Sequence, residues 1–451
     1  MLFKFHGGVH PDEKKSPADK IETTPLNPPP QVVIPMSLHI GAPCRPIVKV
    51  GDTVKLGQKI GDTEAPVSAP VHASVSGKVV AVEPRLTPAG TMVTSVVIEN
   101  DGLDTPCETM VPYPEDRLSD QDAIAALIRE AGIVGMGGAT FPTAFKITSG
   151  KGKVDTLIIN GAECEPYITS DYRTMLEHPD EVLGGIRLLM KACGVSQAFF
   201  AIEDNKADAI RLLNSKNPKD SGINILSLKT RYPQGAEKQL IKTVTGREVP
   251  PGGLPAAVGC AVFNCFTAYS VYRAAYEGRP AIERVVTVAG SAIERPRNYL
   301  VRVGTPLEYV FQQAGGFRKE PHKVIMGGPM MGVAVYDLSV PVIKATNALL
   351  AFCEDETKTV ENPACIRCGK CVQVCPMNLM PLYLYLYEQK DDFAGMEKYR
   401  LTDCIECGAC SYICPGRLHL THSFRAGKAK IAARAAAEKA RKEAAKGTAA
   451  V

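Results

Sequence analysis

Two features that would place a chain across or outside a membrane are missing from this sequence. The first ten residues, MLFKFHGGVH, include Lys4 and no apolar run, so we expect no secretory signal peptide. The longest stretch without charged residues runs from Val249 to Tyr272, but Pro250, Gly253 and other turn formers interrupt it. These residues would break a helix exposed to lipid, so we expect a buried turn and helix there.

Disulfide bonds are not expected either, although the 451-residue chain contains 15 cysteines. Without a signal peptide the chain would stay in the reducing cytosol, where closely spaced thiols bind metal rather than form disulfides. The chain is too long for one hydrophobic core, so we expect two to four domains.

A strong excess of charge is absent, since the formal net charge is only +4. The basic residues gather in the tail, where eight Lys or Arg and two Glu lie between Arg425 and Val451. From Arg425 to Lys446 this tail is rich in Ala, which favours a helix that is either solvated or laid against anionic lipid. Because the tail has almost no large apolar residues, we prefer the solvated helix, and we expect no nucleic-acid partner.

The pattern C-x2-C-x2-C-x3-C-P occurs twice and is the most specific motif in the chain. Zinc ribbons use two separated cysteine pairs, whereas three cysteines at this interval surround three corners of a 4Fe-4S cube. In two-cluster ferredoxins the last cysteine of each run ligates the other cluster, so we expect two clusters with crossed ligation. The expected ligands are Cys365, Cys368, Cys371 and Cys414 for the first cluster, and Cys375, Cys404, Cys407 and Cys410 for the second.

The spacer between the two runs, residues 376–403, is longer than the loop of a minimal bacterial ferredoxin and partly helical in pattern. It predicts a helical two-cluster ferredoxin-like domain. The other cysteines lack ligand spacing and are expected to be buried, reduced thiols. These are Cys44, Cys107, Cys164, Cys193, Cys260, Cys265 and Cys353.

Composition and periodicity divide the chain into segments that predict a multidomain α/β protein. After a Pro-rich arm, short strands separated by G-D and S-G turns resemble a lipoyl- or biotinyl-type barrel-sandwich hybrid. Such carrier domains need a lysine at the hairpin tip, where this chain has Thr63 to Pro66, so we prefer a scaffold role to a swinging carrier. The predicted segments are 1–34 (arm), 35–112 (barrel-sandwich hybrid), 118–281 (layered α/β domain), 282–340 (β-grasp module), 355–422 (cluster domain) and 423–451 (basic tail).

Helical and strand patterns alternate in the 118–281 segment. DQDAIAALIREAG and HPDEVLGGIRLLMKACG have helical periodicity, whereas VDTLIIN and QAFFAIE are apolar strands. This order predicts a layered α/β domain. The strand-turn-strand-helix passage that follows looks like a small β-grasp module.

A glycine-rich stretch, GIVGMGGATFPTAFK (residues 132–146), offers a place for a phosphate or a flavin. Gly135, Gly137 and Gly138 would let a ligand approach the backbone closely, and Lys146 would neutralise its charge. Alone this is weak evidence, because many glycine-rich turns are purely structural. The next strand adds to it, because that strand ends in the acidic sequence NGAECEP.

The loop and this strand end together are similar to the flavin and nicotinamide site of the NADH-binding flavoprotein subunit of respiratory complex I. In that family a GRGGAGFPTG loop precedes an N-x-x-E-x-E-P strand end. The resemblance implies that Gly135, Gly137, Gly138 and Lys146 cradle the FMN phosphate and NADH, with Phe141 as an aromatic wall. It also implies that Asn160, Glu163 and Glu165 line the isoalloxazine and the nicotinamide ribose, acting by hydrogen bonding with no unusual pKa.

Two later segments extend this resemblance. RYPQGAEKQL is similar to the family's Y-x-x-G-E-E segment, and VFNCFT matches a flavin-contacting N-x-x-T. The residues so implied are Tyr232, Gly235, Glu237, Asn264 and Thr267. Ala236 stands where the family has the first of two acids, which leaves the choice between NADH and NADPH open.

The chemistry of the implied cofactors fits together. NADH delivers two electrons as a hydride, whereas a cluster accepts one electron at a time, so a flavin such as FMN is needed between them. No catalytic side chain is expected beyond those that hold the cofactors.

The order of motifs, beginning with FHGGVHP at Phe5 to Pro11, resembles the C subunit of the Rnf (Rsx) electron-transport complex from about Phe3 to about His422. The resemblance implies a peripheral subunit on the cytoplasmic face of a membrane complex, exchanging electrons between NADH and ferredoxin while partner subunits translocate an ion. The implied partners are the other subunits, including a ferredoxin-like iron-sulfur subunit, NAD(H), and soluble ferredoxin indirectly.

Two other functions stay open. A soluble flavin and iron-sulfur reductase, such as a cobalamin reductase, resembles this family but reorders or lacks the N-terminal barrel. The barrel here precedes the flavin loop, which favours the Rnf interpretation. A flavin-free electron wire and scaffold, in which only the clusters work, stays open because of Ala236.

Overall fold

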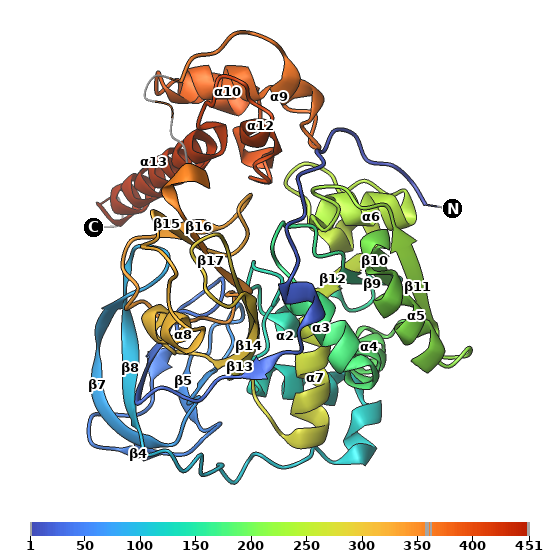
Figure 1. Ribbon diagram of the computed structural model, residues 1–451, viewed down its shortest axis with the longest axis vertical. Helices are drawn as coiled ribbons and strands as arrows, with labels where there is room; N and C mark the ends of the chain where they lie inside the picture. The colour runs from blue at the N-terminus through green and yellow to red at the C-terminus, as the bar shows by residue number, and fades with distance from the viewer. Residues whose placement is uncertain (1, 357–359, 361–362, 449–451) are drawn as a thin grey trace. The chain divides into compact units, whose positions relative to one another are not determined.

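The computed structural model describes residues 2–356, 360 and 363–448, and the chain forms two compact units (Figure 1). The larger unit comprises Asp12–Thr230 and Leu254–Lys358. The smaller unit comprises Met1–Pro11, Arg231–Gly253 and Thr359–Val451. Each unit is therefore assembled from segments that are far apart in the sequence.

The first domain of the larger unit packs two antiparallel sheets around one core. In β7 (Gly77–Leu86) the first residues alternate between buried and exposed, as a strand with one face on a core requires. The fully buried side chains of Val32, Ile60 and Ile98 come from both sheets. One sheet contains β2 (Gln31–Pro35), β8 (Met92–Asn100), β7 and β4 (Thr53–Val54), and the other contains β3 (Arg45–Pro46), β5 (Lys59–Asp62) and β6 (Val71–His72).

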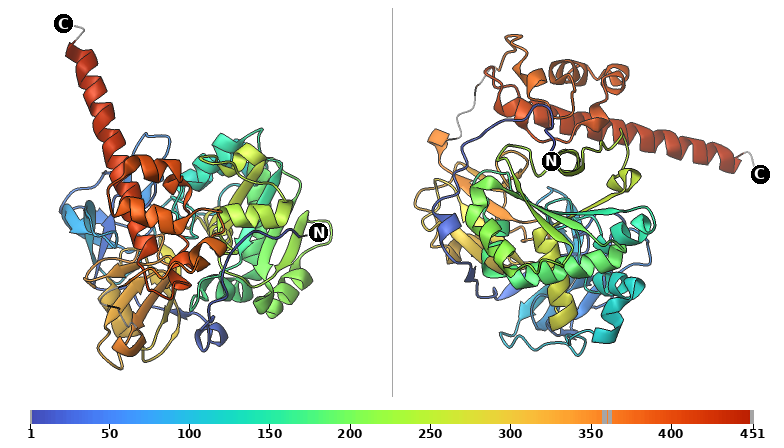
Figure 2. Two further views of the ribbon diagram at one scale, coloured as in Figure 1. Left: turned by 90° about the horizontal axis from the view of Figure 1, so that it is seen from above. Right: turned by 90° about the vertical axis from the view of Figure 1, so that its right-hand side faces the viewer.

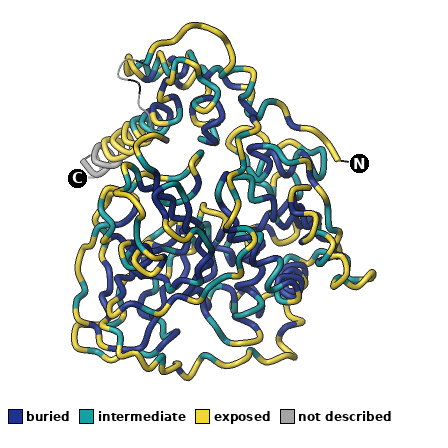
Figure 3. The backbone as a smooth tube through the Cα atoms, viewed as in Figure 1, coloured by how far each residue is buried: buried dark blue, intermediate teal, exposed yellow. Residues whose placement is uncertain are grey.

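The second domain contains a parallel sheet whose described strands follow the order β11, β10, β9, β12. The strands are β9 (Thr156–Gly161), β10 (Ala198–Glu203), β11 (Ile223–Leu228) and β12 (Cys260–Asn264). β9 and β12 are almost wholly buried, as expected for parallel strands covered on both faces (Figure 3). Strands β10 and β11 lie on one side of β9, whereas β12 lies on its other side. The order in which the strands are added therefore reverses between β9 and β12.

Helices accompany this sheet as the sequence pattern predicted. They are α1 (Gln121–Glu130), α2 (Thr143–Gly150), α3 (Ser170–Glu177), α4 (Pro179–Cys193), α5 (Ala207–Lys216) and α7 (Cys265–Glu277). Helices α4 and α7 approach closely, since an ideal Cβ at Gly185 would lie only 1.8 Å from the Ala268 carbonyl oxygen. The uncharged stretch from Val249 contains the predicted turn and the first part of helix α7, with strand β12 between them. This part of the helix is buried as predicted, but the turn is not, since Pro250, Pro251 and Leu254 are exposed.

A mixed sheet completes the larger unit and extends beyond the predicted 282–340 segment at both ends. Strand β17 (Ala348–Phe352), a fully buried ALLAF run, pairs in parallel with β13 and antiparallel with β15. Strand β1 (Thr24–Pro25) of the N-terminal arm pairs with β14. The remaining elements are β13 (Glu283–Ala289), β14 (Arg297–Arg302), α8 (Leu307–Gln313), β15 (Lys323–Met326) and β16 (Val333–Val335).

The smaller unit is helical, including the spacer between the cysteine runs, as predicted. Its core contains Leu384, Met396, Leu401 and Phe424. The helices are α6 (Glu237–Thr245), α9 (Lys370–Gln373), α10 (Pro381–Glu388), α11 (Phe393–Lys398), α12 (Ala409–Tyr412) and α13 (Leu420–Thr448). Figure 2 shows α13 as one uninterrupted helix that begins at the cluster domain and continues into the basic tail.

Short 3-10 helices lie at Ala18–Lys20, Glu115–Ser119, Asp204–Lys206, Pro255–Val258, Glu354–Glu356 and Leu401–Asp403. No helix within the described residues is long and apolar enough to span a bilayer.

Candidate cofactor sites

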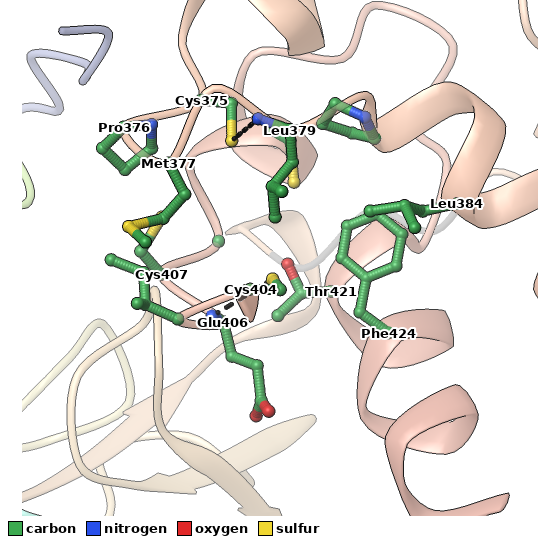
Figure 4. Close-up of a pocket in the computed structure, with 14 residues that line it drawn as sticks. Cys375, Pro376, Met377, Leu379, Leu384, Cys404, Glu406, Cys407, Thr421 and Phe424 are labelled. Atoms are coloured by element: carbon green, nitrogen blue, oxygen red, sulfur yellow. Dashed lines mark hydrogen bonds between the residues drawn. The ribbon is translucent and has the colours of Figure 1, made fainter. Parts of the chain in front are cut away.

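Thiols from both cysteine runs line one cavity of the smaller unit (Figure 4). Cys404, Cys407 and Cys410 come from the second run, and Cys375 is the last cysteine of the first run. Apolar side chains, including those of Leu384 and Phe424, complete the wall. The space that these residues line amounts to about 370 Å³, including the part that is open to solvent.

A second cavity of similar size, about 380 Å³, has the reciprocal composition. It is lined by Cys365, Cys368 and Cys371 of the first run and by Cys414, the last cysteine of the second. The two sets match the crossed sets expected from the spacing. Among the described residues, no group of three His, Cys, Asp or Glu side chains is arranged to hold a single metal ion.

The two cysteine runs have the same local backbone conformation. Arg367 and Glu406 both adopt a left-handed conformation, with φ of 58° and 56°. The Arg367 N–H thereby points at the Cys365 sulfur, and the Glu406 N–H at the Cys404 sulfur, each at 3.3 Å. A backbone N–H donated to sulfur favours the thiolate that iron requires. The sequence spacing did not predict these bonds.

The two sets of thiols differ in burial. Cys365 and Cys368 are exposed, whereas Cys407 is buried and Cys404 half-buried. Burial raises the pKa of Cys404 to about 11 and that of Cys407 to about 12. At neutral pH these groups are therefore protonated until a metal displaces the proton, so metal binding here releases protons.

The segment predicted to contact the nicotinamide nucleotide belongs to the smaller unit. The Tyr232 hydroxyl donates to the Cys407 carbonyl oxygen at 2.5 Å, and the Gln239 amide donates to the Pro376 carbonyl oxygen at 3.2 Å. Gly235 lies in the same segment, and Glu237 is the first residue of α6. Tyr232 and Gln239 therefore contact the backbone next to two of the thiols of the first cavity, a neighbourhood that the sequence did not indicate.

In the larger unit, the glycine-rich stretch folds into a tight loop before α2. The Gly135 N–H donates to the Phe141 carbonyl oxygen at 2.8 Å, which closes the loop. Thr267 stabilises the loop, because its buried hydroxyl accepts a hydrogen bond from the Met136 N–H at 2.9 Å. Gly138 has φ +115°, and no described atom lies within 4 Å of an ideal Cβ there. Its surface is thus open to a ligand.

The carboxyl ends of β9 and β12 lie next to this loop. Asn160 and Asn264 are register partners at these ends, where the strand order changes direction. Ligands of open α/β sheets bind at such switch points. Asn264 also caps α7 through the Phe266 N–H at 2.9 Å and donates to Asp171 at 2.6 Å, while an ideal Cβ at Gly137 would lie 3.3 Å from its side chain.

Glu163 lies directly beyond β9 with φ +48°. One carboxylate oxygen accepts the Asp171 N–H at 2.6 Å. The other is buried without a hydrogen-bond partner among the described residues, as is one oxygen of Asp171. Burial raises the pKa of Glu163 to about 7, against the expectation that these acids need no unusual pKa. Buried polar atoms left without partners are what a polar ligand would satisfy.

Lys15, from the N-terminal arm, holds the loop that follows β9. Its ammonium donates to the carbonyl oxygens of Glu163 and Glu165, both at 3.0 Å, and of Ile168 at 2.6 Å. Nothing in the sequence indicated this lysine, because its partners are backbone groups about 150 residues away.

Three other predicted residues make contacts within the protein. The Glu165 carboxylate accepts the N–H groups of Met330 and Met331 at 3.1 and 2.8 Å. Lys146 donates to the Val262 carbonyl oxygen at 2.9 Å, and Phe141 packs edge-on against Phe145. Glu165 therefore also connects the strand end to the loop between β15 and β16.

A Glu163→Gln variant should change how stability depends on pH. Because the folded state raises the pKa of Glu163 above its ordinary value of 4.5, the folded chain binds this proton more tightly than the unfolded chain. Stability then falls as pH rises from about 4.5 to about 7. The variant lacks this loss, so its melting temperature should match the parent at pH 5 and exceed it by a few degrees, on the order of 1–2 kcal/mol, at pH 7.5.

Melting followed by circular dichroism tests this, with Glu99→Gln, an exposed residue near the end of β8, as the matched control. A difference between parent and Glu163→Gln that is the same at both pH values would contradict the assignment.

Family models match four parts of the chain. They are described as the RnfC barrel sandwich hybrid domain (residues 3–103), the Nuo51 FMN-binding domain (128–273), the SLBB domain (285–334) and the 4Fe-4S dicluster domain (357–415). These matches confirm the predicted fold class and the predicted cofactors, FMN and two 4Fe-4S clusters.

Relatives of known name align over most of the chain. The C subunit of the Na(+)-translocating ferredoxin:NAD(+) oxidoreductase complex of Acetobacterium woodii is 48% identical over 95% of this chain and 97% of its own length. The C subunit of the proton-translocating complex of Clostridium ljungdahlii is 46% identical over 89% and 88%. The C subunit of the ion-translocating oxidoreductase complex of Rhodobacter capsulatus is 43% identical over 96% and 84%.

Among solved structures, NAD+-reducing [NiFe]-hydrogenase in the H2-reduced state is similar in fold, with a TM-score of 0.51 and 19% identity. The similarity covers 69% of this chain and 61% of the hydrogenase chain.

Proposed function

Because this chain belongs to the family of C subunits of ion-translocating ferredoxin:NAD(+) oxidoreductase complexes, we propose that it is the subunit through which electrons pass between NAD(H), FMN and two 4Fe-4S clusters. The observation that carries the proposal is the crossed arrangement of the thiols. Two neighbouring cavities with four thiols each suit two cubes that exchange single electrons.

FMN, when bound, accepts two electrons from NADH and releases them one at a time. We assign its cradle to Gly135, Gly137 and Gly138, because the loop is open at Gly138 and lies at the switch point of the parallel sheet. Thr267 and Asn264 hold the loop and the strand end in position. Glu163 presents its unpartnered oxygen for hydrogen bonding, and Lys146, Phe141 and Asn160 complete the proposed site.

Tyr232, Gly235 and Glu237 are proposed to contact the nucleotide, as the motif in their segment suggests. The acid that the related motif has before Glu237 is Ala236 here. A carboxylate near the adenosine ribose repels the 2'-phosphate of NADPH. Because Ala236 has no carboxylate, one basis for selecting NADH over NADPH is weakened. A test of this function must therefore compare NADH with NADPH.

The relatives are named as subunits of complexes, and we propose the same assembly for this chain. It would lie peripherally on the cytoplasmic face of the membrane, beside a ferredoxin-like iron-sulfur subunit. Partner subunits would couple electron transfer to ion translocation and would exchange electrons with soluble ferredoxin. Helix α13 begins in the cluster domain, where Arg425 and Lys428 pair with Glu406, so the first turns of the basic tail hold the cluster domain together.

Anaerobically purified chain loaded with its cofactors should release FMN into the supernatant after acid precipitation, and its flavin and cluster absorbance should bleach on addition of NADH. The physical reason is that the two-electron donor site and the one-electron clusters are parts of one chain. Anaerobic absorbance spectroscopy measures the bleaching, with NADPH in a parallel cuvette and dithionite as the reference for full reduction.

Three results would redirect the proposal. Clusters without flavin would support the electron wire. Rapid turnover of NADH without any membrane partner would favour a soluble reductase. Clusters that dithionite bleaches but NADH leaves oxidised, in a chain that holds FMN, would contradict NADH oxidation by this subunit.

A further inference from the structure

The two thiol-lined cavities of the smaller unit have different surroundings. We call the cavity with Cys407 the inner cavity and that with Cys365 the outer cavity. Tyr232 and Gln239 of the 231–245 segment donate hydrogen bonds to backbone carbonyl oxygens in the wall of the inner cavity. Among the described residues, one acidic side chain lines this cavity, that of Glu406, and it is paired with Lys428 at 2.7 Å and Arg425 at 3.1 Å.

The outer cavity opens to solvent, and an exposed apolar side chain lines it. Its ligand candidates Cys365 and Cys368 are exposed. Between them Ile366 is 67% exposed. An isolated exposed apolar side chain is common, but Ile366 belongs to the lining of the outer cavity, where a redox partner would need close contact.

Basic residues distinguish the outer cavity from the inner one. The two cysteine runs differ at equivalent positions. The first run has Arg367 where the second has Glu406, and Lys370 where the second has Ala409. Arg417, which has the same left-handed backbone as its equivalent Asn378, adds a third. All three basic residues are exposed, and no acidic residue lines the outer cavity within the described residues. The opening therefore presents positive charge around an apolar centre.

We propose that this rim, formed by Ile366 and Arg367 of the cavity lining and by the exposed residues Lys370 and Arg417 next to lining residues in the sequence, docks a redox protein whose own redox centre is surrounded by acidic residues. The proposal rests on the proposed function only in requiring a cluster in the outer cavity. The reaction at the interface is the transfer of one electron, in which the reduced cluster is oxidised, the partner centre is reduced, and no bond forms or breaks. Opposite charges steer such encounters, and their effect falls with ionic strength.

The acidic haem domain of cytochrome b5 and the basic cytochrome c serve as probes of opposite charge. The full, cofactor-loaded chain is reduced with dithionite, desalted anaerobically and mixed with each probe in a stopped-flow instrument. We expect the rate with cytochrome b5 to fall about tenfold or more between roughly 20 mM and 500 mM salt, because the Debye length shrinks over this range. With cytochrome c the rate should stay constant or rise.

Neutralising variants assign the effect to the rim. The triple variant Arg367→Gln, Lys370→Gln and Arg417→Gln should lower the low-salt rate with cytochrome b5 about tenfold and remove most of its salt dependence. The triple variant Lys390→Gln, Lys398→Gln and Lys442→Gln is the matched control, because it removes three exposed basic residues elsewhere in the smaller unit. Iron content confirms that each variant keeps both clusters.

A salt-independent rate with cytochrome b5 would overturn the proposal, as would equal losses in the two triple variants. Reduction by dithionite makes this result independent of NADH. If NADH fails to bleach the chain but the rim variants act as expected, the electron-input function fails and the docking surface stands.

Discussion

The double variant Cys365→Ser with Cys414→Ser should lose one cluster and keep the other, although its two changes lie in different cysteine runs. Both thiols line the outer cavity, so the second change damages a site that the first has already broken. Iron should fall from about eight to about four atoms per chain. The inner cavity keeps its four thiols, and its cluster should still be reduced by dithionite. Iron analysis and low-temperature electron paramagnetic resonance measure both effects.

The double variant Cys365→Ser with Cys375→Ser provides the opposing case, since both changes lie in the first run. Cys365 lines the outer cavity and Cys375 the inner one, so both clusters should be lost. Cys107→Ser, far from both cavities in sequence, should leave the iron content unchanged. If each run held its own cluster, the two double variants would exchange their results, and the crossed assignment would be wrong.

The cluster domain was predictable from sequence because cluster ligation is local. Three cysteines at fixed intervals surround one cube with no help from the rest of the fold, and the last cysteine of each run has only the other cube within reach. The backbone bonds from Arg367 and Glu406 to sulfur depend on left-handed conformations, which residue types other than glycine do not reveal.

The parallel sheet was predictable for a similar reason, since buried strands contain continuous apolar runs such as LII in β9. The mixed sheet was predicted only in part, as a β-grasp module, which the SLBB match supports. Strands β1 and β17 were not predicted, because β17 pairs with strands that precede it by tens of residues and β1 is only two residues long. The contacts of Lys15 and Glu165 are likewise non-local and reach backbone groups. Residue identity carries almost no information about such partners.

The flavin site was predictable as a set of motifs but not as a set of contacts. Asn264 and Thr267 were predicted from a pattern associated with flavin contact. In the structure Asn264 accepts a hydrogen bond at the start of α7, and Thr267 accepts one from the glycine loop. The raised pKa of Glu163 arises from burial, which a motif cannot report. The test of this site must therefore address the open surface of the loop.

Gly138→Ala should weaken FMN binding by at least about tenfold, which corresponds to roughly 1.4 kcal/mol. The added methyl group would enter the space above the loop, where no described atom lies within 4 Å, and would keep a ligand from the backbone N–H groups. The φ of +115° adds backbone strain for any residue with a Cβ. Fluorescence titration of the flavin-free chain with FMN measures the affinity, and iron analysis should show both clusters retained.

Gly51→Ala separates the loss of the cradle from the backbone strain. Gly51 precedes β4 in the barrel with φ +96°, and an ideal Cβ there also has no described atom within 4 Å. The control therefore carries a similar strain at a site with no predicted ligand, and it should lower the melting temperature while leaving FMN affinity unchanged. If Gly138→Ala behaved in the same way, binding FMN at parental affinity with only a lower melting temperature, the open face of the glycine loop would not be the place where the flavin lies.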